Sequence, residues 1–128
     1  MQKKIDNEIS RMIENLQDKD SNTLYAFKDE ELYFLNQDKI QSIYAEDGKI
    51  FARTDENQYL LKKRLYELEE ILNPKKFVRI SNSEIVNIKK VEKINFKLTE
   101  TIVLHFKNGE VTYVSRRYIK KIKEFLEL

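Results

Sequence analysis

The chain has 128 residues and a formal net charge of +2, a length sufficient for one domain with a single modest core. It contains no cysteine, which excludes a disulfide framework and a thiolate metal site. No apolar run approaches the roughly 20 residues that span a bilayer, and none at the N-terminus resembles a signal peptide, so we expect a cytoplasmic protein without membrane insertion.

Residues 3–18 are expected to form an amphipathic helix. Their apolar side chains recur at helical spacing, at Ile5, Ile9, Met12, Ile13 and Leu16. Because an isolated helix of about 16 residues is marginal in water, this stripe must be buried on the domain's own sheet or against a second copy of the chain. We therefore predict an N-terminal helical segment at residues 1–22, for packing or dimerisation, and a domain at residues 23–128.

From Thr23 the pattern changes to short runs rich in aromatic and β-branched residues, which are typical of strands. Asp47-Gly48 is a two-residue hairpin signal between two of these runs. A short helix is predicted over Lys62–Leu72, with one leucine face, and Asn73-Pro74 ends it. The candidate strands before this helix are Thr23–Phe27, Leu32–Leu35, Ile40–Ala45, Ile50–Thr54 and Gln58–Leu61.

The C-terminal part continues as strands followed by one helix. The predicted strands are Phe77–Ile80, Ile85–Ile88, Val91–Phe96, Thr101–Phe106 and Glu110–Val114. A polar turn at residues 81–84 separates the first two, and Asn108-Gly109 marks a second hairpin. Ser115 is predicted to cap a final helix, whose inward face carries Tyr118, Ile119, Ile122, Phe125 and Leu126. The pattern therefore predicts a mainly β fold with short helices.

The small net charge hides an asymmetry along the chain. Residues 21–72 hold seven Lys and Arg against eleven Asp and Glu, whereas residues 73–128 hold thirteen against six, a net charge of +7. A basic face on an otherwise balanced protein is the electrostatic footprint expected of a phosphate-backbone binder. The alternative is a lysine-rich surface that is simply solvated.

The predicted middle helix and the predicted last helix both begin with basic residues, which oppose the helix dipole at a cost of a few tenths to about 1 kcal/mol each. A bound phosphate would resolve this conflict. Alternatively, the side chains bend away and pair with carboxylates such as Glu46 or Asp47. The basic residues concerned are Lys62, Lys63 and Arg64 in the middle helix, and Arg116 and Arg117 in the last one.

Two stretches place small hydrogen-bonding residues and arginines beside hydrophobic anchors: Phe77–Asn87, FVRISNSEIVN, and Val114–Ile119, VSRRYI. In order and spacing they resemble the signature of the LytTR family, the mostly β DNA-binding domain of many bacterial transcription regulators. That signature is roughly Phe-x-Arg-x-His-polar-Ser-x-x-Val-Asn, followed after a β-hairpin by Val-Ser-Arg-Arg-Tyr and a C-terminal helix. The resemblance covers about residues 23–128, and it implies an elongated arrangement of small β-sheets that binds duplex DNA.

The resemblance also implies roles for individual residues. Asn82 matches the polar residue that reaches DNA, and Arg117 matches the family's DNA-contacting arginine; such side chains can bond adenine and guanine bidentately. The alternative for Asn82 is a turn-making role. Ser83 would contact a phosphate or cap the turn, and Arg116 would serve a phosphate or a carboxylate partner. Lys49 falls near a third loop through which the family touches DNA.

The sequence departs from the family pattern at two positions. Ser81 stands where many members have His, and Glu84 where an aromatic residue is common. Because a carboxylate repels phosphate, Glu84 must turn inward, be paired, or mark a weaker binder. Asn87 is expected to be structural. Twenty-two residues before the domain are too few for a receiver domain, so we expect no switch through phosphorylation of one.

No enzyme activity, cofactor or metal site is expected. His105 is the only histidine, and the two glycines lie too far apart for a phosphate-binding loop. The sequence instead predicts a small response-regulator-like transcription regulator that reads double-stranded DNA, with tandem half-sites that favour a homodimer. The alternative is a protein-interaction module that retains the LytTR fold and uses the N-terminal helix to bind a regulatory protein partner.

Overall fold

Short strands are the main regular elements among the described residues. The computed structural model describes residues 22–96 and 101–128, together with Glu8 and Arg11. Apart from those two positions, the helix predicted for residues 3–18 lies outside the described residues. Within the described ranges, no helix is long and apolar enough to cross a membrane.

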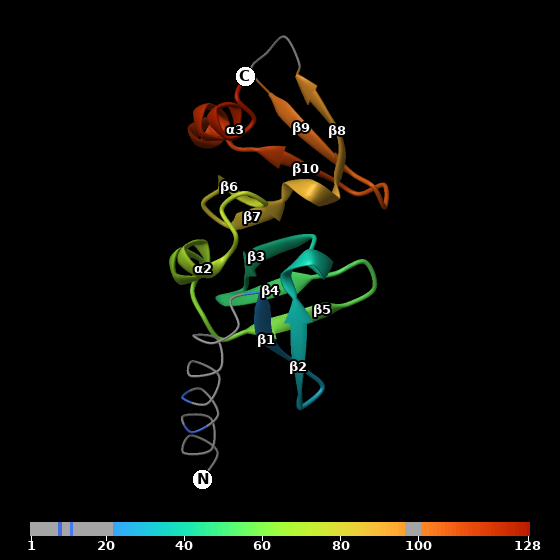
Figure 1. The fold of residues 1–128 in the computed structure, drawn as a ribbon, viewed down its shortest axis with the longest axis vertical. Helices are drawn as coiled ribbons and strands as arrows, with labels where there is room; N and C mark the ends of the chain where they lie inside the picture. The colour runs from blue at the N-terminus through green and yellow to red at the C-terminus, as the bar shows by residue number, and fades with distance from the viewer. Residues whose placement is uncertain (1–7, 9–10, 12–21, 97–100) are drawn as a thin grey trace.

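The described strands form two antiparallel sheets, which are stacked along the long axis of the molecule (Figure 1). The larger sheet has the strand order β2-β1-β5-β4-β3-β7-β6, and the smaller one has the order β10-β9-β8. The strands are β1 (Thr23–Lys28), β2 (Glu31–Asn36), β3 (Ser42–Glu46), β4 (Lys49–Arg53), β5 (Gln58–Leu61), β6 (Phe77–Ser81), β7 (Glu84–Asn87), β8 (Val91–Phe96), β9 (Ile102–Phe106) and β10 (Val111–Val114).

Two short helices lie on the same side of these sheets in the view of Figure 1, α2 (Leu65–Ile71) and α3 (Ile119–Phe125). This composition confirms the mainly β prediction. The seven-stranded sheet is larger than the small sheets that were expected.

The predicted hairpin turns are confirmed. Asp47 and Gly48 both have positive φ angles, 52° and 76°, and Glu46 pairs with Lys49 across the turn. These are the angles that a two-residue turn requires and that glycine adopts at low cost. Gly109, with φ of 92°, lies in the longer loop that joins β9 to β10.

Both helix starts were predicted too early. Lys62 and Lys63 lie in a bend, and α2 begins only at Leu65. The carboxylate of Glu67, in the first turn, accepts a hydrogen bond from the Arg64 backbone N–H at 3.0 Å. An acidic group at this place suits the helix dipole, so the conflict predicted for this helix is not present at its first residues.

The last helix also differs from the prediction at its start. Residues Arg116–Tyr118 form a 3₁₀ turn, and α3 begins at Ile119. The side chain of Ser115 makes no capping hydrogen bond, so the predicted cap is wrong. The predicted inward face is confirmed, because Ile122 is fully buried and the other four residues pack against the same core.

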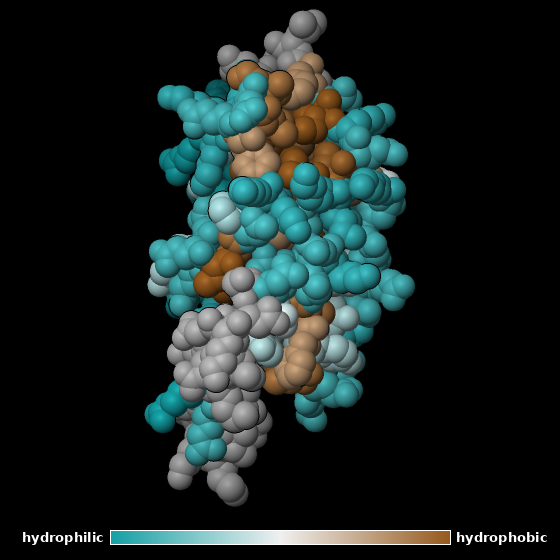
Figure 2. Space-filling model, in the orientation of Figure 1, coloured by the Kyte–Doolittle hydropathy of each residue, from teal (hydrophilic) through white to brown (hydrophobic). Residues whose placement is uncertain are grey.

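Two hydrophobic cores share the hairpin β6–β7. Phe77 and Ile85 face the core under the larger sheet, whereas Val78, Ile80 and Val86 face the core between the smaller sheet and α3. The polar turn at residues 81–84 is therefore held from both sides. On the face drawn in Figure 2, hydrophilic side chains cover the middle of the molecule, and apolar ones gather toward the end that holds the smaller sheet.

Asn87 is structural, as expected. Its side chain is 1% exposed, and its Nδ2 donates to the Ile40 carbonyl at 2.9 Å. Its Oδ1 accepts from the Lys89 backbone N–H at 3.0 Å and so caps the 3₁₀ turn at Ile88–Lys90. A buried amide with both ends satisfied fixes the end of β7 against the segment just before β3.

Candidate nucleic-acid interface

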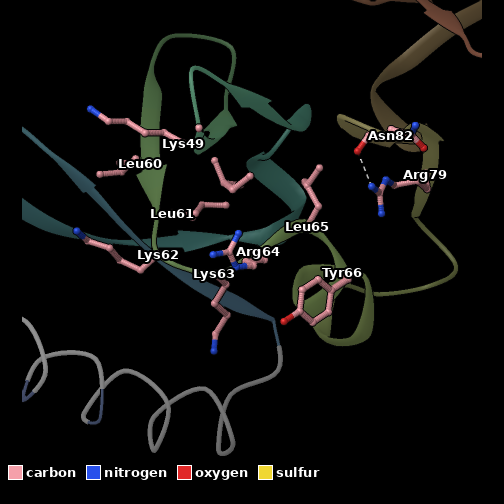
Figure 3. A pocket seen from close by; sticks show the side chains of 12 residues that line it. Lys49, Leu60, Leu61, Lys62, Lys63, Arg64, Leu65, Tyr66, Arg79 and Asn82 are labelled. Carbon is pink, nitrogen blue, oxygen red and sulfur yellow. Dashed lines mark hydrogen bonds between the residues drawn. The ribbon is translucent and has the colours of Figure 1, made fainter.

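A groove of about 590 Å³ lies between the turn before β4, the bend before α2 and the turn after β6. Figure 3 shows Lys49 on one strand, the basic residues of the bend below it, and Arg79 with Asn82 on the opposite wall. None of the side chains that line this basic groove is acidic. The basic and polar lining residues are Lys49, Lys62, Lys63, Arg64, Tyr66, Arg79 and Asn82.

Four of these cations are available to a ligand. Among the described residues, Lys49, Lys62, Lys63 and Arg64 form no ion pair, so the predicted alternative of pairing with nearby carboxylates is not found there. The Lys62 ammonium lies 5.4 Å from the centroid of the Phe27 ring. An exposed cation–π contact of this kind is worth about 0.5–1 kcal/mol and leaves the charge accessible.

Arg79 has a different role, which the sequence did not reveal. Its Nε donates to the Ser81 carbonyl at 2.7 Å, and its Nη2 donates to the Asn82 carbonyl at 2.5 Å. The Glu69 carboxylate of α2 pairs with the same guanidinium and also with Lys121 of α3, at 3.2 Å. Arg79 is thus neutralised and holds the turn in place. The only sequence signal for this role is the position of Arg79 between the buried Val78 and Ile80 of β6.

Asn82 projects from that turn. It is exposed, and its Oδ1 accepts a hydrogen bond of 2.8 Å from the hydroxyl of Tyr118. Its φ angle is not positive, and its side chain has no bond to its own backbone among the described contacts. The turn-making alternative is therefore not supported by the geometry.

Ser83 is exposed beside Asn82. Its backbone N–H donates to Ser81 Oγ at 3.2 Å, and its carbonyl accepts from the Ala45 N–H at 2.8 Å. The turn is thereby joined to β3. The Ser83 hydroxyl contributes only a long contact of 3.4 Å to Ser81 Oγ, which leaves it accessible to a phosphate.

Arg116 and Arg117 lie outside the basic groove. Both are exposed in the 3₁₀ turn before α3, and Arg116 lines a separate groove of about 350 Å³ with Lys120 and Lys123. The predicted site residues therefore fall in two places. The hydrogen bond from Tyr118 to Asn82 connects them.

Glu84 turns inward and is paired. Its Oε1 accepts a hydrogen bond from the Thr112 hydroxyl at 2.8 Å. Burial raises the pKa of Glu84 above its ordinary value, and the bond from Thr112 opposes part of that rise. Because this carboxylate points to β10, it does not line the basic groove.

Comparisons with known proteins show the family of the chain. The family model of the LytTr DNA-binding domain matches residues 30–127. The chain belongs to the LytTR family. The chain is 36% identical over 126 residues to relatives in Staphylococcus aureus strains NCTC 8325 / PS 47 and COL. These relatives are named as uncharacterized HTH-type transcriptional regulators, and the match covers 98% of this chain and 85% of each of theirs. A solved LytTr DNA-binding domain from Bacillus cereus has the same fold, with a TM-score of 0.80 at 24% identity, and covers 84% of this chain and 98% of that one.

LytTR domains are DNA-binding domains and not a class of enzyme. His105, the one histidine, lies in β9 opposite Lys93 and Val111. No group of metal-binding side chains occurs within the described part of the chain.

Proposed function

We propose that this LytTR protein binds duplex DNA sequence-specifically and regulates transcription. The observation that carries the proposal is the basic groove, in which four cations without a described ion pair adjoin the exposed turn of Asn82. The Staphylococcus aureus relatives are named as transcriptional regulators, which supports the same role. Phosphate contacts fix the register of such a protein on the duplex, and side chains that reach base edges supply the specificity.

The proposal divides the candidate residues into two groups. Asn82 and Arg117 reach base edges in successive major grooves, and Ser83 bonds a phosphate beside Asn82. The cations of the basic groove and of the 3₁₀ turn bind phosphates; they are Lys49, Lys62, Lys63, Arg64 and Arg116.

Loops rather than a recognition helix enter the grooves in this proposal. The described α-helices have seven residues each, and five strands separate them in the chain. A helix-turn-helix requires two helices joined by a short turn. The name of the Staphylococcus aureus relatives therefore does not describe how this fold would read DNA.

Selection of bound sequences from a random duplex pool tests the proposal. We expect enrichment of a defined motif, and retention on DNA that weakens steeply with salt, by about 0.9 in log K per phosphate contacted for each unit of log salt concentration. No enrichment, together with negligible retention at low salt, would contradict it.

Tandem half-sites and a homodimer form the second part of the proposal. The apolar stripe predicted for residues 3–18 would join two copies, because two linked domains gain affinity through effective concentration. Deletion of residues 1–20 should then leave a folded monomer that binds one half-site and loses much of its affinity for the pair. An intact chain that sediments as a monomer at tens of micromolar, with a destabilised truncation, would instead place the stripe on the domain itself.

The alternative function is a protein-interaction module. It is favoured by apolar side chains on the edge strand β2, where Phe34 is 68% exposed and Leu32 39% exposed. Such residues on one strand suit a partner's apolar surface. Binding that is insensitive to salt, in a chain that DNA does not retain, would favour this alternative.

A further inference from the structure

A hydrogen bond between side chains joins the two LytTR motifs across 36 positions of sequence, from the Tyr118 hydroxyl to Asn82 Oδ1 at 2.8 Å. The Tyr118 ring packs against the core between the smaller sheet and α3. A phenol whose ring is anchored in a core holds its hydroxyl at a defined place. The Asn82 side chain is therefore fixed by a group outside its own turn.

The backbone of the turn does not need this bond. Arg79 already holds the Asn82 carbonyl, and the Ala45 N–H holds the carbonyl of Ser83. The φ angle of Asn82 is not positive, so other residues could adopt it. The effect of the Tyr118 hydroxyl is thus confined to the direction of the Asn82 amide.

That direction decides what the amide offers to DNA. A carboxamide that can turn over presents either its oxygen, an acceptor, or its NH₂ group, a double donor. Here Oδ1 already accepts from Tyr118, and no described residue accepts from Nδ2. The Nδ2 protons are consequently the free part of the side chain.

We propose that Tyr118 is a positioning residue for sequence readout, which holds Asn82 with its Nδ2 donors toward the base. The inference rests on the proposed function, in which Asn82 reaches a base edge. In the major groove guanine and thymine offer acceptors as their only hydrogen-bonding groups, cytosine offers a donor, and adenine offers one of each. Asn82 held in this way favours guanine or thymine over cytosine, and it pairs less well with adenine than a freely rotating asparagine.

The test compares Tyr118→Phe, which removes only the hydroxyl, with Tyr113→Phe, which removes an exposed hydroxyl from β10. The base pair read by Asn82 is first located as the position whose preference is lost in Asn82→Ala. Duplexes that differ at this position are then titrated by fluorescence anisotropy. We expect Tyr118→Phe to reduce the preference for guanine or thymine over adenine about five-fold, the value of one ordinary hydrogen bond.

Three further readouts separate positioning from general stability. Affinity for random DNA, the salt slope and the melting temperature should stay at their wild-type values in Tyr118→Phe. The Tyr113→Phe control should keep the wild-type base preference. In an Asn82→Ala background, Tyr118→Phe should have no additional effect on base preference, because the hydroxyl then has no amide to hold.

The possible failures are distinguishable. A wild-type chain that shows no base preference overturns the proposed function and this inference with it. A wild-type preference that Tyr118→Phe leaves intact overturns the inference alone. A preference for cytosine at the base pair that Asn82 reads also overturns the inference. So does a loss of base preference in Tyr118→Phe that is equal at all positions and accompanied by a lower melting temperature.

Discussion

Replacement of the three basic residues of the bend, Lys62→Gln, Lys63→Gln and Arg64→Gln together, should remove three phosphate contacts. None of these side chains has an ion pair among the described residues, so their charges are not already committed. Arg64 holds the start of α2 through its backbone N–H, which glutamine retains. We therefore expect the variant to fold like the wild type, with an unchanged melting curve.

The magnitude follows from the count of phosphate contacts. The proposed function assigns five cations to phosphates, so log K should fall by about 4.5 for each unit of log salt concentration in the wild type and by about 1.8 in the triple variant. Between about 50 and 200 mM salt, the wild type should lose about 500-fold in affinity and the variant only about 12-fold. The affinities of the two proteins should therefore approach each other as salt rises.

A matched control separates position from total charge. Lys39, Lys75 and Lys107 are exposed, lie outside the basic groove and form no ion pair with a described residue. Their joint replacement by glutamine removes the same charge. Fluorescence anisotropy on random and selected duplexes at several salt concentrations gives the slopes. If the control lowers the slope as much as the groove variant does, the assignment of phosphate contacts to the groove is refuted.

Three other changes have defined outcomes. Arg117→Ala should reduce the binding free energy on the selected site by about 1–3 kcal/mol and relax the preference at one base pair, whereas Arg116→Ala should weaken binding to all duplexes similarly. An equal loss on specific and random DNA for Arg117→Ala would place Arg117 among the phosphate-binding residues. Glu84→Gln should raise the melting temperature at neutral pH, because a pKa that is raised in the folded state means that the ionised carboxylate destabilises the fold. This gain should disappear as the pH falls toward the ordinary pKa of a glutamate carboxyl. A gain that does not depend on pH would contradict this cause. Asp29→Asn with Glu30→Gly should stabilise the protein by about 1–2 kcal/mol at the turn between β1 and β2. The two residues have positive φ angles of 50° and 67°, which asparagine and glycine adopt more readily. An unchanged denaturation midpoint would show that neither residue is strained.

The local features of the fold could be predicted from the sequence. The turn at Asp47-Gly48 depends on two neighbouring residues whose preferred φ angles match the hairpin. The start of α2 was misplaced because periodicity shows which residues share a face and not where the first helical residue lies. The Glu67 carboxylate decides that point through its bond to the Arg64 N–H.

The contacts that organise the site could not be predicted in this way. Glu84 accepts a hydrogen bond from Thr112, 28 positions away, and Asn82 Oδ1 accepts one from Tyr118, 36 positions away. No spacing rule connects residues that lie so far apart in the chain on different elements. The resemblance to the LytTR motifs predicted which stretches matter, and the tertiary packing shows how one stretch orients the other.

The hairpin β6–β7 explains why the two motifs can act as one unit. Its buried side chains alternate between the two cores, and the Ile80 carbonyl accepts from the Ser115 N–H at 2.8 Å. The position of the 3₁₀ turn that carries Arg117 is therefore set by the same strand that carries the turn of Asn82. Interiors packed at crystal-like density transmit small shifts between such neighbours. The relative position of the two turns that carry the proposed base-reading residues is thus set by a packed hairpin, which suits recognition of a defined spacing of base pairs.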